Sequence, residues 1–250
     1  MRYVAVDTET WLIQPGLLSP PLVCLSYCES REVIHRDDCP VKHGASATCV
    51  AGFECSRGGL LLAKDALAYL RGLLSDPNVV IVLHNGSYDF AVACACDDAH
   101  PGCDGGDCGW PCPECSGGYG SHDYPDCSRP GGGRCVCKRE PLINLVFRAY
   151  DEGRIRDTMV REMLIDIAAG SLGWAIVNGK NTKKNYSLES LSMQYLGHQL
   201  DKGADGWRTK YAELDGVPLD QWPPRARKYA TDDAIETLDV FFAQGGDIPD

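Results

Sequence analysis

The chain has 250 residues, of which 44% are hydrophobic and 24% charged, with 24 Lys and Arg against 35 Asp and Glu. This composition predicts a globular protein long enough to bury a substantial core, and no stretch approaches the roughly 20 apolar residues that span a membrane. Asp7 interrupts the first apolar run, which argues against a secretory signal peptide, so we expect an intracellular, cytoplasmic location. The net charge of −11 argues against a broad basic surface for duplex nucleic acid.

Four strands are predicted in the first third of the chain. The apolar run 2–7 indicates a central strand, and residues 22–28 and 31–36 indicate two more, joined by a tight polar turn. Residues 38–59 are expected to form a small loop insertion. A fourth strand, Val79–Leu83, is apolar throughout, which predicts that it is buried.

Helices are predicted from apolar spacing and from capping residues. Leucines at helical spacing predict a helix over 60–74, and another helix begins at about Tyr88. The later helices are predicted over 157–169, 187–196 and 225–244, with Asp157 and Ser187 as N-caps and Gly197 as a terminator. Strands followed mostly by helices predict one mixed α/β domain over 1–250.

Cysteines are concentrated in one segment, because nine of the 14 fall between residues 94 and 137. This Cys-rich insertion, bounded at 93–139, contains one large aliphatic residue, Val136, so it cannot bury a hydrophobic core. Thiolate–metal bonds are the natural substitute, and we expect one or two structural Zn²⁺ ions, with disulfides and unligated thiols as alternatives. The predicted zinc ligands are Cys94, Cys96, Cys103, Cys108, Cys112, Cys115, Cys135 and Cys137.

The first predicted strand ends in two acidic residues, Asp7 and Glu9. Residues two apart in a strand point to the same face, so both carboxylates can converge on one point. Two carboxylates that face each other need a cation or a proton between them. Taken alone, the pattern also fits a solvated strand end.

Two further motifs contain carboxylates. Asn85 and Asp89 follow the apolar strand 79–83, at a strand–helix junction where α/β sheets place their sites. Tyr229 and Asp233 are four residues apart and share one face of the last helix. For each motif taken alone, the simpler alternatives are a favourable helix dipole at Asp89 and an ordinary exposed helix face at Asp233.

Together and in this order, the three motifs resemble those of the DEDD exonuclease superfamily, and Tyr229 places the resemblance in its DEDDy branch. This branch includes the 3′→5′ proofreading domains of family A DNA polymerases, and the stretch Lys202–Pro223 resembles the exonuclease region of phage-type members. Asp157 matches a further family position, where an N-cap or a structural hydrogen bond is its simplest role. The resemblance covers roughly residues 2–37, 60–92 and 140–244, and it implies an RNase H-like mixed sheet flanked by helices.

The resemblance also implies hydrolysis of phosphodiester bonds with two Mg²⁺ or Mn²⁺ ions, which hard carboxylate oxygens favour over zinc. Asp7, Glu9 and Asp233 would hold the first ion. Asp7 would also bridge to the second ion, with Asp89 supporting it. Tyr229 would orient the attacking water. The candidate substrate contacts are Asn85 and, through its backbone, Thr8.

The implied activity is a 3′→5′ exonuclease that shortens single-stranded or frayed 3′ ends of DNA, as in proofreading. Trp11 and Leu12 follow the first motif, where core packing and contact with the terminal base are both open. The same chemistry on RNA is the enzymatic alternative, because nothing in the sequence selects the 2′-hydroxyl. A catalytically inactive, zinc-bearing module that binds nucleic acid or protein is the alternative from another class.

The partners implied are a single-stranded 3′ end and a polymerase module or replication protein, with no membrane. The resemblance to phage-type enzymes also suggests a phage-encoded protein made in a bacterial host.

Overall fold

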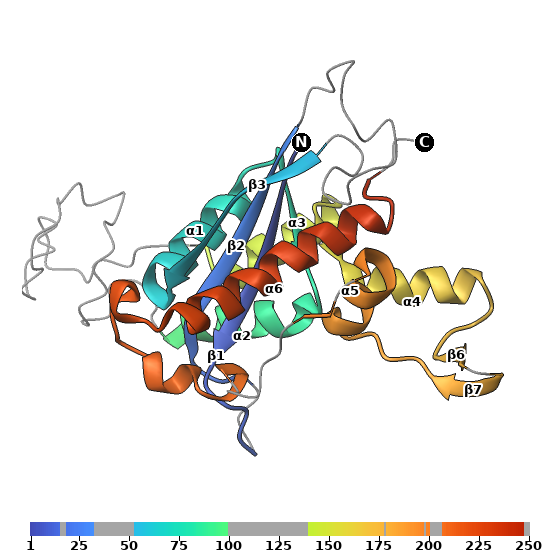
Figure 1. Ribbon diagram of the computed structural model, residues 1–250. Coiled ribbons are helices and arrows are strands. Elements are labelled where there is room, and N and C mark those ends of the chain that lie inside the picture. The colour runs from blue at the N-terminus through green and yellow to red at the C-terminus, as the bar shows by residue number, and fades with distance from the viewer. Residues whose placement is uncertain are drawn as a thin grey trace, which may run out of the picture.

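The computed structural model contains a five-stranded sheet with helices packed against both faces (Figure 1). It describes residues 1–15, 19–32, 53–99, 140–177, 179–197, 199–200 and 207–247. The sheet consists of β1 (Arg2–Thr10), β2 (Leu22–Glu32), β3 (Phe53–Leu62), β4 (Val79–Leu83) and β5 (Ile155–Asp157), and a separate hairpin pairs β6 (Trp174–Val177) with β7 (Lys180–Lys183). The α-helices are α1 (Ala63–Ser75), α2 (Gly86–Ala99), α3 (Leu142–Asp151), α4 (Thr158–Ala168), α5 (Leu188–Leu196) and α6 (Pro224–Ala243).

The strand order in the sheet is β3-β2-β1-β4-β5. β1 pairs antiparallel with β2, which pairs antiparallel with β3, whereas β4 is parallel to both β1 and β5. The predicted α/β class, with a mixed sheet flanked by helices, is therefore confirmed.

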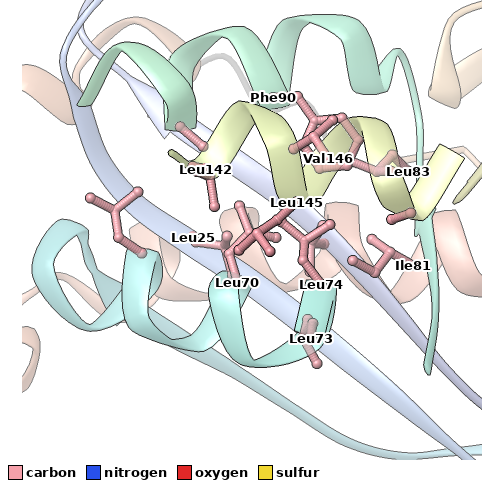
Figure 2. Packing of buried hydrophobic residues seen from close by; sticks show 14 of the residues in the cluster. Leu25, Leu70, Leu73, Leu74, Ile81, Leu83, Phe90, Leu142, Leu145 and Val146 are labelled. Atoms are coloured by element: carbon pink, nitrogen blue, oxygen red, sulfur yellow. The ribbon is translucent and has the colours of Figure 1, made fainter. Parts of the chain in front are cut away.

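The central strand β1 contributes alternate side chains to two cores. Val4 and Val6 point into a core shared with α1, α2 and α3, part of which Figure 2 shows. Tyr3 and Ala5 point the other way, into a core shared with α6. Because successive strand residues alternate between faces, odd positions of β1 face α6 and even positions face the other three helices.

The tight turn predicted after residue 28 is wrong, because β2 continues as one strand to Glu32. Its pairing with β3 shifts between Glu29 and Ser30. The Ser30 hydroxyl accepts a hydrogen bond from the Tyr3 N–H at 3.3 Å and donates one to the Tyr3 carbonyl at 3.1 Å. The Ser30 side chain therefore ties β2 to β1 at the point where the pairing of β2 with β3 shifts. Residues 33–36, the rest of the predicted third strand, lie outside the described residues.

The third strand of the sheet, β3, begins at Phe53, inside the loop insertion predicted over 38–59, and α1 starts directly after it at Ala63. A pair of glycines masks this strand in the sequence, because glycine is a weak strand former. A Cβ on Gly59 would lie 2.8 Å from the ring of Tyr27, so only glycine allows this approach of β2 and β3. The insertion prediction is wrong from Phe53 onward, and its earlier residues lie outside the described part of the chain.

The helix α2 extends to Ala99, so the predicted Cys-rich insertion does not begin at residue 93. Cys94 and Cys96 lie on this helix and pack against the core that includes α1 and α3. Residues two apart on a helix point about 200° apart, so these two thiols do not converge on one ion. Residues 100–139, with the other six predicted zinc ligands, lie outside the described residues.

The three predicted caps, Asp157, Ser187 and Gly197, are confirmed. Asp157 accepts hydrogen bonds from two N–H groups in the first turn of α4, and Ser187 caps α5. Gly197 ends α5 in the left-handed conformation, with φ at 75°. The sequence pattern does not predict β5, β6 or β7, because strands of three or four residues carry little periodicity. In the described ranges, no helix is long and apolar enough to cross a membrane.

Candidate metal centre

Three carboxylates from opposite ends of the sequence converge between β1 and α6. Asp7 and Glu9 occupy odd positions of β1 and therefore face α6, from which Asp233 meets them. One oxygen of each carboxylate lies within 4.8 Å of the other two, and Glu9 is buried while the other two are half-buried. Among the described residues, this is the only such group of three or more acidic, His or Cys side chains.

Negative charge is concentrated at this three-carboxylate group. Two unit charges about 4 Å apart repel by about 4 kcal/mol at an effective dielectric constant of about 20. Burial, and then the charges of Glu9 and Asp7, raise the pKa of the Cys24 thiol, which lies opposite Glu9 on β2. Burial and then Glu9 likewise raise the pKa of Tyr211. A divalent cation would offset the repulsion, and an all-oxygen donor set suits Mg²⁺ or Mn²⁺.

Tyr229 lies one helical turn before Asp233 on α6 and is half-buried. Its ring centroid is 6.2 Å from that of Tyr211, in the short helix η3 (Tyr211–Leu214). The Tyr211 hydroxyl donates to the Ala226 carbonyl at 2.8 Å, and its ring also packs against Trp222. This aromatic cluster fixes the first half of α6 against the sheet, and with it the position of the Tyr229 ring.

Asp89 approaches β1 from the other side. β4 pairs with β1 only as far as Ala5, and the chain then turns away into α2. Beyond the end of this pairing, Asp89 in the first turn of α2 accepts a backbone hydrogen bond from β1 in place of a strand partner. Its Oδ1 atom accepts hydrogen bonds from the Thr8 N–H at 3.0 Å and from the Thr8 hydroxyl at 2.6 Å.

The two hydrogen bonds to Asp89 occupy both donors of Thr8, including the backbone N–H considered for substrate binding. Burial raises the pKa of Asp89 to about 7; the Thr8 hydrogen bonds oppose this rise, and the charge of Asp157 adds to it. Asp89 is not part of the three-carboxylate group. Asp89 is instead bonded to Thr8, the residue between Asp7 and Glu9 on β1.

Asn85 forms the turn between β4 and α2 with φ at 65°, a conformation that is uncommon outside glycine and often found near functional sites. Asp157 holds this turn by accepting the Asn85 N–H at 3.3 Å and the Gly86 N–H at 2.7 Å. A Cβ on Gly86 would lie 2.9 Å from Leu83, so the turn requires glycine there. The Asn85 side chain is exposed. It is accessible to a ligand, and its predicted contact with a substrate stays a prediction.

Asp157 has two structural roles, and the sequence predicts only one of them. Its place before a helix predicts the N-cap, whereas its bonds to the turn that leads into Asp89 require knowledge that β4 and β5 are neighbours. The same carboxylate therefore ties α4 to the Asp89 turn. No local signal reveals that second function.

Three apolar residues follow the acids of β1. Trp11, Leu12 and Ile13 are 39%, 52% and 67% exposed, so they are not part of a core in the described structure. The Trp11 indole N–H donates to Asp215 at 3.0 Å, which orients the ring. An apolar surface therefore lies next in the chain to Glu9 and Thr10.

No family model matches the chain, and no curated protein is significantly similar to it. The DEDDy resemblance therefore stays a prediction from the motifs, and the convergence of the three carboxylates is an independent observation beside it.

Proposed function

We propose that the chain is a metal-dependent 3′→5′ exonuclease of the DEDDy type, acting on single-stranded or frayed 3′ ends of DNA. The observation that carries the proposal is the convergence of Asp7, Glu9 and Asp233 within 4.8 Å. The two ends of the chain contribute to one site, in the motif order that the resemblance requires. The strand order, with its antiparallel and parallel halves, is compatible with an RNase H-like fold.

The three-carboxylate group fits one Mg²⁺ or Mn²⁺ ion, and the resemblance implies a second one. Asp7, Glu9 and Asp233 would hold one ion, and Asp7 would share the second with Asp89. When bound, the ions supply Lewis-acid activation of the scissile phosphate and lower the pKa of the attacking water. Thr8 would keep Asp89 oriented by the two hydrogen bonds that it already donates.

Tyr229 has the position and chemistry of a group that orients water. It is on the same face of α6 as Asp233 and one turn away, and its ring is held by the Tyr211 cluster. A phenol that donates or accepts a single hydrogen bond can hold a water molecule for attack without removing its proton. Tyr229→Phe should therefore slow hydrolysis while leaving ion binding in place.

The exposed Trp11, Leu12 and Ile13 suit a terminal base, because stacking on an apolar surface is worth about 1–3 kcal/mol per base and is indifferent to sequence. A site that accepts any 3′ nucleotide is what an exonuclease needs. Substrate would then be held by the base at this surface and by its phosphate at the carboxylates.

The decisive experiment measures stepwise shortening of 5′-labelled single-stranded, mismatched and fully paired DNA, and of the matching RNAs, with Mg²⁺ or Mn²⁺. Asp7→Ala and Asp233→Ala should each lower the rate by about 10³-fold or more, and EDTA should abolish it. Asp232→Ala is the matched control, because Asp232 is next to Asp233 but pairs with Lys228 on the outer face of α6.

Shortening that persists in Asp7→Ala would contradict the proposed centre. Shortening of RNA with little shortening of DNA would transfer the same mechanism to RNA. Binding of single-stranded DNA with no shortening by the wild type would favour the inactive module.

A further inference from the structure

The helix α4 is inverted relative to an ordinary surface helix. It buries its polar residues, Thr158, Glu162 and Asp166. Its outward side chains are apolar, and the largest exposed ones are Val160, Leu164, Ile165 and Ile167. A helix at the surface of a globular protein normally has the opposite arrangement.

The buried polar side fixes this orientation. Glu162 accepts hydrogen bonds from Lys184 at 2.6 Å and Tyr195 at 2.6 Å, and Asp166 accepts one from Tyr186 at 2.7 Å. Rotation of α4 would break these bonds and leave buried charges unpaired. The remaining charged side chain of the helix, Arg161, points back to the Gly246 carbonyl at 2.6 Å. The apolar side of α4 is therefore held outward.

The apolar surface continues beyond the helix. We define the α4 face as Val160, Leu164, Ile165, Ile167, Leu172 and Trp174, which are between 39% and 60% exposed. Figure 1 shows α4 extending away from the sheet, with the β6–β7 hairpin beyond its end. Monomeric proteins rarely leave a contiguous apolar surface of this kind in contact with water unless something binds it.

We propose that the α4 face is a dimer interface, occupied by α4 of a second copy of this chain. Residues 160, 164 and 167 follow the i, i+4, i+7 spacing of a helix that packs along another helix. The face contains no charged side chain that would select a different partner, and an apolar stripe is complementary to itself.

The exposed area agrees with a small dimer interface. Six large side chains at these exposures provide on the order of 500 Å² per copy, or about 1,000 Å² for two, which is the lower bound for a specific interface. The projection of α4 from the sheet lets two copies approach along this helix. A reversible dimer is therefore expected, with dissociation in roughly the micromolar range.

Charge repulsion between the hairpins favours the antiparallel arrangement. The stretch 167–188 contains three Lys and no acidic residue, in a chain of net charge −11. Lys180 and Lys183 of β7 are exposed. If two α4 helices pack antiparallel, the hairpin after each helix lies beside the N-terminal end of the other, so the two basic hairpins are kept apart. A parallel arrangement would instead place the two basic hairpins together.

The test is the molar mass in solution, measured by sedimentation velocity or light scattering from roughly 1 to 200 μM. The wild type should change from monomer to dimer across this range. Leu164→Glu should remain monomeric, with the dissociation constant of the dimer raised by about 100-fold or more, because a charge would be buried in an apolar interface. Phe147→Glu on α3 is the matched control, since Phe147 is 61% exposed on another helix, and it should dimerise like the wild type.

Circular dichroism melts of both variants confirm that they are folded. A wild type that stays monomeric at the highest concentration overturns the proposal. So does a dimer that persists in Leu164→Glu but is lost in Phe147→Glu, which would place the interface on α3. A monomeric wild type that binds anionic phosphatidylserine vesicles, with binding lost in Leu164→Glu, would overturn it by assigning the face to lipid. None of these measurements depends on nuclease activity.

Discussion

Two regions of the molecule gather carboxylates, and they are built in different ways. The three-carboxylate group brings Asp7, Glu9 and Asp233 within 4.8 Å at the junction of β1 and α6. The second region is the buried side of α4, where Glu162 and Asp166 share the ammonium group of Lys184, at 2.6 and 2.9 Å. We call this second region the α4 network.

Every oxygen of Glu162 in the α4 network has a donor from the protein. Oε1 accepts from Lys184 and Gln194, and Oε2 accepts from Tyr195 and Gln244. Burial alone would raise the pKa of Glu162, but these hydrogen bonds outweigh it and lower the pKa, and the same balance lowers the pKa of Asp166.

These lowered pKa values have a defined effect on stability. A carboxyl group with a lowered pKa stabilises the fold above its unfolded-state pKa of about 4, and this contribution is lost as the pH falls through the folded-state value. The α4 network is thus completed by the chain's own cation. In the three-carboxylate group, three acidic side chains lie within 4.8 Å of one another, which is the arrangement of a site for an added cation.

The largest expected effect separates the two regions by stability. Glu162→Ala should lower the free energy of unfolding by about 3–5 kcal/mol, because Tyr195 and Gln244 would lose their acceptor and Lys184 would keep only Asp166. Urea denaturation followed by circular dichroism measures the change. Glu213→Ala, at an exposed site in η3, is the control and should stay within about 0.5 kcal/mol of the wild type. A loss below about 1 kcal/mol in Glu162→Ala would mean that the α4 network is not a structural element.

The next effect concerns the added cation. At 100 times its dissociation constant, Mg²⁺ or Mn²⁺ should stabilise the wild type by about 2.7 kcal/mol, or roughly 5–11 °C in Tm. EDTA should reverse the shift, which differential scanning fluorimetry detects. Asp233→Asn should abolish it, and the neighbouring Asp232→Asn should keep it. An equal shift in both variants would place the ion elsewhere.

The sequence predicts one of these regions and not the other, for a physical reason. Strand alternation places Asp7 and Glu9, two positions apart, on one face, and the i, i+4 spacing does the same for Tyr229 and Asp233. That β1 and α6 meet is a tertiary fact, which the motif order supplies only by resemblance. The three acids converge as expected. The hydrogen bonds between Asp89 and Thr8 could not be predicted, because they depend on where the pairing of β4 with β1 ends.

The α4 network has no comparable local signal. Glu162 lies between Arg161 and Met163, and its donors come from β7's end, α5 and the residue after α6, which are 22 to 82 positions away. A glutamate in a helix is usually exposed, so the pattern of the sequence gives the wrong face. The strand β3 is not predicted for the same reason. The need for glycine at position 59, next to the Tyr27 ring, is evident only once β2 and β3 are paired.

The smallest effect should have the opposite sign to the first. In EDTA, Asp7→Asn removes one of three crowded negative charges and keeps the shape of the side chain. The free energy of unfolding should therefore rise, by no more than about 1 kcal/mol, because solvent reaches half-buried Asp7 and screens part of the repulsion. Urea denaturation at low ionic strength detects the gain, and added salt should reduce it. A loss of more than about 1 kcal/mol would show that Asp7 stabilises the fold through its own contacts, and the contrast with Glu162 would then fail. If Asp7→Asn gains stability in EDTA and is no longer stabilised by Mg²⁺ or Mn²⁺, the repulsion among the three acids serves cation binding and opposes folding.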